Sequence, residues 1–118
     1  MKTKKERRAA WVAALRSGDY EQTMGGLKDG VGYCCLGVAC DVSELGKWED
    51  DGVYSCGEEH KCGGYLTDVI CDYYGLSTIS GTFDDERSLA ELNDSGKTFN
   101  EIADIIESEP PGLFLDED

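Results

Sequence analysis

The chain has 118 residues and a formal net charge of −14 at pH 7. This length predicts one domain, residues 1–118, which buries most of its apolar surface without help from a metal or a disulfide. The basic N-terminus lacks the apolar core of a signal peptide, and no apolar run is long enough to span a membrane, so we expect a soluble, cytosolic protein. Its six cysteines are then expected to be reduced thiols.

The charge is unevenly placed along the chain. Six basic side chains against Glu6 give residues 1–16 a net charge of +5, so the remaining residues carry −19. Because so acidic a body repels phosphate backbones, we expect no direct nucleic-acid binding outside the N-terminal arm. Acidity of this size indicates solubility alone, an acidic face for a basic protein, or mimicry of DNA. The carboxylates are spread over loops and helix faces, which favours solubility.

A basic helix is predicted for residues 4–17. Thr3 and Glu6 have the spacing of a capping box, in which each side chain bonds the backbone N–H of the other residue. Four alanines favour the helix, and Gly18 can end it in the left-handed conformation. We expect Trp11 to anchor this helix in the core.

A β-hairpin is predicted next, with strands at about 24–28 and 31–34. Asp29-Gly30 lies between apolar residues, and this pair is typical of a two-residue hairpin turn because both positions need φ > 0. Gly32 lies inside the second strand, and such a glycine weakens a strand unless another part of the chain packs closely against it.

A buried central helix should follow the hairpin directly. Its apolar residues recur at helical spacing from Cys35 to Leu45, and Gly46 can end it. The small residues Gly37 and Ala39 would let another backbone approach closely. Half of the cysteines lie in the run from Gly32 to Asp41, where a free thiol behaves as a small hydrophobic group.

The C-terminal half is expected to be mostly helical. A long loop is predicted at 47–64, with a turn at Asp51-Gly52 and a brief strand at Val53-Tyr54. A helix at 65–74, ended by Gly75, and a strand near 79–83 should follow. A short helix capped by Asp84 or Asp85 then carries Leu89 and Leu92 and ends near Asn93, and the last helix runs from the capping box Thr98/Glu101 to Pro110. The apolar triplet 113–115 either folds back onto the core or contacts another chain. The fold class is therefore α+β, with four to five short helices packed on a small antiparallel hairpin or sheet.

A zinc site is the alternative to a protein without cofactors. Cys56, His60 and Cys62 form a Cys-x3-His-x-Cys cluster in a glycine-rich loop, and thiolate and imidazole are ligands that zinc prefers. Another cysteine would have to supply the fourth ligand. Because this spacing is not that of paired zinc knuckles, and a domain with so much apolar helix does not need metal, we expect unliganded thiols.

No catalytic residue is predicted. A thiol nucleophile would need Cys34 or Cys35 at a helix N-terminus with His60 as its base, and nothing else completes such a site. The sequence has no phosphate-binding loop of the Walker type, dinucleotide fingerprint, metalloprotease signature or hydrolase elbow. We therefore expect a binding protein and not an enzyme.

Candidate ligand contacts lie in the loops that flank the hairpin and the last two helices. Loops held by a scaffold are where binding residues concentrate, and these carry an aromatic ring, amides and a carboxylate. An arginine would supply positive charge for a phosphate. The asparagine and aspartate could instead simply shape their turn. The predicted contacts are Arg16, Tyr20, Gln22, Tyr33, Asn93 and Asp94.

Three blocks of the sequence resemble small proteins of unassigned function encoded by tailed bacteriophages. The blocks are Trp11-x-x-x-Leu15-Arg16-Ser17-Gly18-x-Tyr20-x-Gln22, Gly32-Tyr33-Cys34-Cys35-Leu36-Gly37-Val38-x-Cys40-Asp41 and Leu92-Asn93-Asp94-x-Gly96-x-Thr98-Phe99-x-x-Ile102-Ala103. The resemblance implies a phage accessory gene that is expressed in the cytoplasm of the bacterial host and is dispensable for making virions. It implies no established activity.

Two binding functions follow from that context. The first is sequestration of a host defence signal, such as a nucleotide, near the hairpin. The second is inhibition of a basic host protein through the acidic surface, aided by the apolar tail. The short strands and the tail also permit a symmetric homo-oligomer.

Overall fold

The computed structural model describes residues 3–24, 26–29, 32–49, 52–57, 61–62, 65–83 and 87–115. The first helix, α1 (Lys4–Arg16), has the predicted bounds to within one residue. Both hydrogen bonds of the capping box are present, and Gly18 follows the helix in the left-handed conformation. Trp11 is fully buried, and its Nε1–H donates to the carbonyl of Cys35 at 3.1 Å. This bond joins α1 to the central helix.

The central helix, α2 (Cys35–Ser43), is buried on nearly every side. A Cβ on Gly37 would collide with the carbonyl oxygen of Leu27, so this glycine allows the close backbone approach that the sequence predicted. The predicted C-terminal end of this helix, at Gly46, was wrong. Glu44 ends the helix in the left-handed conformation at φ 57°, and Leu45 is exposed. Gly46 is instead packed against the carbonyl of Ser55, in a sheet that the sequence did not predict.

The predicted hairpin strands are absent among the described residues of segment 24–34. The chain does reverse there, with one antiparallel bridge between Lys28 and Tyr33. The backbone of Tyr33, however, bonds the preceding loop: its N–H donates to Glu21 O at 2.8 Å, and its carbonyl accepts from Thr23 N at 2.8 Å. The bonds that flank the bridge to Lys28 are made by other residues, from Asp29 N to Gly32 O at 2.9 Å and from Cys34 N to Leu27 O at 3.0 Å. The ladder does not extend because the chain enters α2 at Cys35.

The segment predicted as a long loop contains a three-stranded antiparallel sheet, in the order β1 (Lys47–Trp48), β2 (Tyr54–Ser55), β3 (Lys61–Cys62). Trp48 pairs with Tyr54, and Tyr54 pairs with Cys62. The brief strand predicted at Val53-Tyr54 corresponds to β2. The other two strands were not predicted, because two-residue strands are too short to show an alternating pattern in the sequence. Lys47 pairs with Ser55, which places it on the face opposite to Trp48.

The third helix, α3 (Asp68–Tyr74), starts later than predicted and ends at Gly75 as expected. The predicted strand near 79–83 is present as β4 (Thr82–Phe83), which pairs with β5 (Arg87–Ser88). Helix α4 (Leu89–Asp94) is capped by Ser88, whose hydroxyl accepts from Glu91 N. The predicted caps at positions 84 and 85 lie outside the described residues, and the observed cap replaces them.

The last helix, α5 (Phe99–Ser108), begins with the second predicted capping box. Glu109 ends it in the left-handed conformation, directly before the two prolines. Leu113 is fully buried, and its carbonyl accepts from Ser77 N, so the apolar tail folds back onto the chain. Leu115, by contrast, is 46% exposed.

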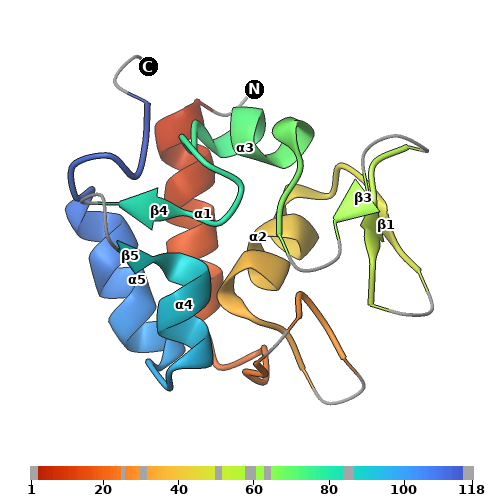
Figure 1. The fold of residues 1–118 in the computed structure, drawn as a ribbon, viewed down its shortest axis with the longest axis horizontal. Coiled ribbons are helices and arrows are strands. Elements are labelled where there is room, and N and C mark those ends of the chain that lie inside the picture. Colours follow the sequence, from red (N-terminus) through yellow and green to blue (C-terminus); the bar gives the residue numbers. More distant parts are fainter. Residues whose placement is uncertain are drawn as a thin grey trace.

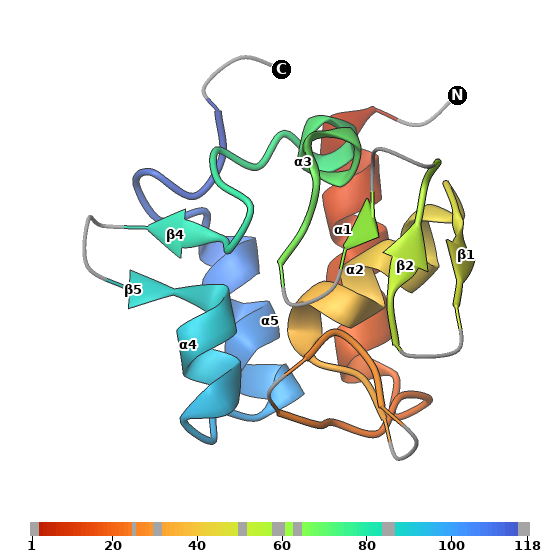
Figure 2. The same ribbon diagram turned by 45° about the vertical axis from the view of Figure 1, so that its right-hand side comes forward.

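The buried side chains form one hydrophobic core to which all five helices contribute. In Figures 1 and 2 the sheet β1–β3 lies on one side of the helices, and the pair β4–β5 lies on the other. The predicted α+β class is confirmed. Among the described residues, no helix has the length and apolar character needed to cross a membrane.

Candidate functional site: an aromatic cluster around Asp41

Four aromatic rings form a continuous cluster between the loop after α1 and the sheet. Tyr20 meets Tyr33 edge-on with ring centroids 5.0 Å apart, Tyr33 meets Trp48 at 5.7 Å, and Trp48 meets Tyr54 at 4.8 Å. The first three rings are half-buried, whereas Tyr54 is 2% exposed. Edge-to-face pairs of this kind fix ring orientation in addition to burying apolar area.

Asp41, at the C-terminal half of α2, holds two of these rings. The hydroxyl of Tyr20 donates to Oδ2 of Asp41 at 2.6 Å, and Nε1–H of Trp48 donates to Oδ1 at 3.0 Å. Both carboxylate oxygens therefore accept a bond from a ring. Hydrogen bonds to an ionised acceptor are stronger than neutral ones, so this carboxylate sets the positions of both rings.

Lys28 brings a positive charge to the cluster. Its Nζ lies 5.4 Å from the ring centroid of Tyr33 and 5.4 Å from that of Trp48. A cation within about 6 Å of an aromatic face is attracted by the ring. The half-buried ammonium thus lies next to two ring faces in a strongly acidic protein.

The hydroxyls of Tyr20 and Tyr54 stay protonated at neutral pH. Burial, followed by the hydrogen bond and charge of Asp41, raises the pKa of Tyr20 well above its usual range. Burial also raises the pKa of Tyr54. Because neither hydroxyl ionises near pH 7, these two residues present neutral rings and hydrogen-bond donors.

A second network joins two of the predicted ligand residues. Nε2 of Gln22 donates to Oδ1 of Asn93 at 2.9 Å and to the carbonyl of Lys97 at 2.7 Å. The same Oδ1 accepts from the N–H of Cys35 at 3.1 Å, and Nδ2 of Asn93 donates to Thr23 O at 2.7 Å. Asn93 is fully buried, so it positions the chain and offers no surface to a ligand.

A family match covers the aromatic cluster. Residues 1–80 match the model of a domain of unknown function, DUF8296. The chain belongs to this family. No curated protein and no solved structure matches the chain. All of the cluster residues lie within the matched DUF8296 region, and Asn93 lies beyond it.

The blocks that carry the phage resemblance meet in space. Two of the bonds between the first and second blocks, from Trp11 to Cys35 and from Tyr20 to Asp41, lie within the DUF8296 match. Asn93, from the third block, bonds both Gln22 and Cys35. Residues from all three blocks are therefore joined by hydrogen bonds.

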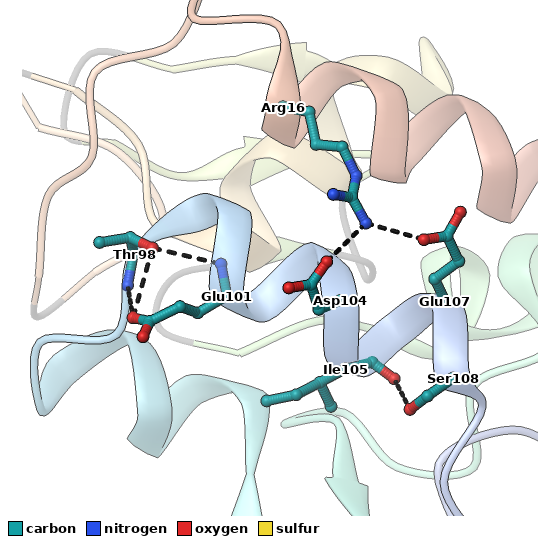
Figure 3. Close-up of polar contacts among 7 residues, drawn as sticks. All are labelled: Arg16, Thr98, Glu101, Asp104, Ile105, Glu107 and Ser108. Carbon is teal, nitrogen blue, oxygen red and sulfur yellow. Dashed lines mark hydrogen bonds and ion pairs between the residues drawn. The ribbon is translucent and has the colours of Figure 1, made fainter.

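The remaining predicted contacts do not join the cluster of the DUF8296 domain. Arg16 lies at the end of α1 and reaches across to α5, where its Nη2 pairs with Asp104 at 2.9 Å and Glu107 at 2.8 Å (Figure 3). Its charge is directed toward these carboxylates. Asp94 is exposed at the end of α4. Of the six predicted contacts, Tyr20 and Tyr33 meet in the aromatic cluster, and Gln22 and Asn93 meet in the amide network.

The candidate thiols at the start of α2 are buried. Burial raises the pKa of Cys34 and raises that of the fully enclosed Cys35 further, in spite of the backbone N–H groups at the helix N-terminus. Both thiols are therefore protonated at neutral pH. A protonated, enclosed thiol is a poor nucleophile and a poor metal ligand.

The predicted zinc cluster lies largely outside the described residues. His60 is not among them, nor is the side chain of Cys62, while Cys56 is half-buried. Within the described part of the chain, no group of three metal-ligating side chains comes together. The cluster of Cys56, His60 and Cys62 therefore stays a prediction.

Sequence reasoning missed four residues of the aromatic cluster: Lys28, Asp41, Trp48 and Tyr54. Asp41 closes the second sequence block, which was a usable signal because a carboxylate at the end of a buried helix needs hydrogen-bond donors. Trp48 lies in the segment interpreted as a loop. Nothing in the sequence marked Lys28 as a site residue. Its amine lies near Tyr33 because of the chain reversal and near Trp48 because of the position of β1, and both are features of the tertiary structure.

Proposed function

We propose that this chain is a phage accessory protein that acts in the host cytoplasm by capturing a small, planar, anionic molecule such as a nucleotide-type defence signal. The observation that carries the proposal is the position of Lys28, whose Nζ lies 5.4 Å from the centroids of both Tyr33 and Trp48. A cation beside two half-buried rings suits a ligand that combines a planar ring with negative charge.

The rings offer a stacking surface. Each base that stacks on an aromatic side chain contributes about 1–3 kcal/mol, and stacking tolerates different bases because every base has a π-face. Tyr33 and Trp48 are oriented before a ligand arrives, since Trp48 is bonded to Asp41 and Tyr33 packs against Tyr20. Such preorganisation lowers the entropy lost on binding.

The charge around the cluster limits the class of ligand. Among the described residues, Lys28 is the cation that lies over Tyr33 and Trp48, and the protein as a whole is strongly acidic. One ammonium suits one anionic group. We therefore favour a ligand of low charge, such as a nucleoside monophosphate or a cyclic nucleotide, over a triphosphate or a nucleic acid.

Isothermal titration with a panel of nucleoside mono-, di- and triphosphates and cyclic nucleotides tests the proposal. Lys28→Gln should raise the Kd of a binding nucleotide about tenfold, the loss of one charge-assisted contact. Lys47→Gln is the matched control, because Lys47 precedes Trp48 and lies on the opposite face of the sheet. It should leave the Kd unchanged. Equal effects of the two substitutions would exclude this surface.

A second experiment identifies the natural ligand. The purified protein is incubated with an extract of infected, defence-carrying cells, recovered and heated, and the released small molecules are analysed by mass spectrometry. A released planar anion supports capture. A co-purifying basic host polypeptide without any small molecule supports the alternative, inhibition through the acidic surface, and contradicts the capture proposal.

A further inference from the structure

A groove runs between α1 and α5, away from the aromatic cluster. The two helices lie antiparallel (Figure 1), and Arg16 at the end of α1 pairs with Asp104 and Glu107 of α5. The groove has a volume of about 450 Å³. Its lining residues are Lys5, Arg8, Ala9, Val12, Ala13, Arg16, Ile106, Glu107 and Glu109.

The floor of the groove is apolar and made of small residues. Ala9 and Ala13 are exposed and lie four residues apart on one stripe of α1, while Val12 and Ile106 are buried beneath them. The distance between packed helix axes, about 8–10 Å, is set by the side chains at the contact. Alanines at this position permit the close approach of another helix.

The two edges of the groove have opposite charges. Lys5 lies on the α1 edge and Glu109 on the α5 edge, while Arg16 and Glu107 pair with each other across the groove at 2.8 Å. This local pattern repeats the division of the whole chain into a +5 segment, residues 1–16, and a −19 remainder. The basic helix of one molecule is therefore complementary to the acidic edge of another molecule of the same chain.

We propose that this groove is the contact surface between two copies of the chain, with α1 of each copy in the groove of the other. A two-fold axis makes the contact self-complementary, so that Lys5 of each copy lies opposite Glu109 of the other and the alanine stripes cross. The arrangement pairs a basic side chain of α1 with an acidic side chain of the partner at both ends of the contact. It thereby offsets the repulsion between two acidic bodies at the point of contact.

Sedimentation equilibrium of the full chain over a range of concentrations tests this surface. Wild type should have twice the mass of one chain. Ala13→Arg should raise the dissociation constant of the dimer about tenfold or more, because a long charged side chain separates the helices. Asn100→Arg is the control: it adds the same charge at an exposed position of α5 outside the groove, and it should dimerise as wild type does. Far-UV circular dichroism establishes that both variants fold.

Charge reversal tests the predicted pairing separately. Lys5→Glu and Glu109→Lys should each weaken self-association, because each places like charges opposite one another. An equimolar mixture of the two variants should recover the dimer, since both pairs are then attractive. A monomeric wild type at every concentration would overturn the proposal, as would equal effects of Ala13→Arg and Asn100→Arg, or a mixture that stays monomeric.

Discussion

Gln22 and Asn93 are separated by 71 positions in the sequence, yet Nε2 of Gln22 lies 2.9 Å from Oδ1 of Asn93. That bond connects the loop after α1 to α4. The same oxygen accepts from the first N–H of α2, so one buried amide fixes three segments relative to one another. Tyr20 is two residues before Gln22, and its hydrogen bond to Asp41 continues this connection into the aromatic cluster.

Replacement of Asn93 should strongly destabilise the fold. Asn93→Ala removes the partners of Cys35 N, Gln22 Nε2 and Thr23 O in a buried setting, and we expect a loss of about 2–4 kcal/mol in the free energy of unfolding. Urea denaturation measures the loss. Asn100→Ala, at an exposed position of α5, should change the free energy by less than about 0.5 kcal/mol. Equal losses would show that the buried network contributes nothing.

The stability of the fold should fall at alkaline pH. The folded state raises the pKa of Tyr20, so the unfolded chain gives up this proton at a lower pH than the folded chain does. The stabilisation is therefore complete below the unfolded pKa of about 10 and is lost as the pH rises through the folded value. Urea denaturation at pH values above the unfolded pKa should show that the free energy of unfolding falls less steeply with pH for Tyr20→Phe than for wild type. Equal slopes for the two proteins would contradict the raised pKa of Tyr20.

The thiols of α2 should react only when the fold opens. Cys35 and Cys40 are fully buried, Cys34 is 5% exposed, and burial raises the pKa of both Cys34 and Cys35. Alkylation with iodoacetamide, followed by mass spectrometry of the peptide that holds the three cysteines, should find them unmodified in buffer and modified in urea. The half-buried Cys56 should react faster in buffer. Rapid labelling of Cys34 in the native protein would contradict its placement.

The capping box of α5 should contribute measurably to stability. The Thr98 hydroxyl accepts from Glu101 N at 3.2 Å, and the Glu101 carboxylate accepts from Thr98 N at 2.9 Å (Figure 3). Thr98→Ala should cost about 1 kcal/mol in the free energy of unfolding. Ser108→Ala removes a hydroxyl at the other end of the same helix, where it bonds Ile105 O, and should cost less. Thermal denaturation compares the two variants.

The stability that this capping box contributes should decrease at acidic pH. Its hydrogen bond to Thr98 N lowers the pKa of Glu101, so its contribution is present above the unfolded pKa of about 4.3 and is lost as the pH falls through the lower folded value. Wild type and Glu101→Ala should therefore differ in melting temperature at neutral pH, and the difference should shrink in acid as the carboxylate is protonated. A difference that grows in acid would contradict this account.

The sequence by itself determined the long helices and the fold class. The capping boxes at Thr3 and Thr98, the glycine after α3 and the apolar periodicity of α5 act within a few residues of one another, so they can be interpreted without knowledge of the rest of the chain. The burial of Trp11 followed in the same way from its place among alanines. These features are local, and each is visible in one short stretch.

The tertiary structure alone decided the sheet and the site. The predicted hairpin is limited to one bridge because the chain enters α2 directly after Cys34, and the segment predicted as a long loop forms three short strands through cross-strand pairing. The aromatic cluster depends on Asp41 meeting Tyr20 and Trp48, which come from separate elements. Contacts between distant segments leave no periodic trace in the sequence, because their geometry exists only after the helices have packed.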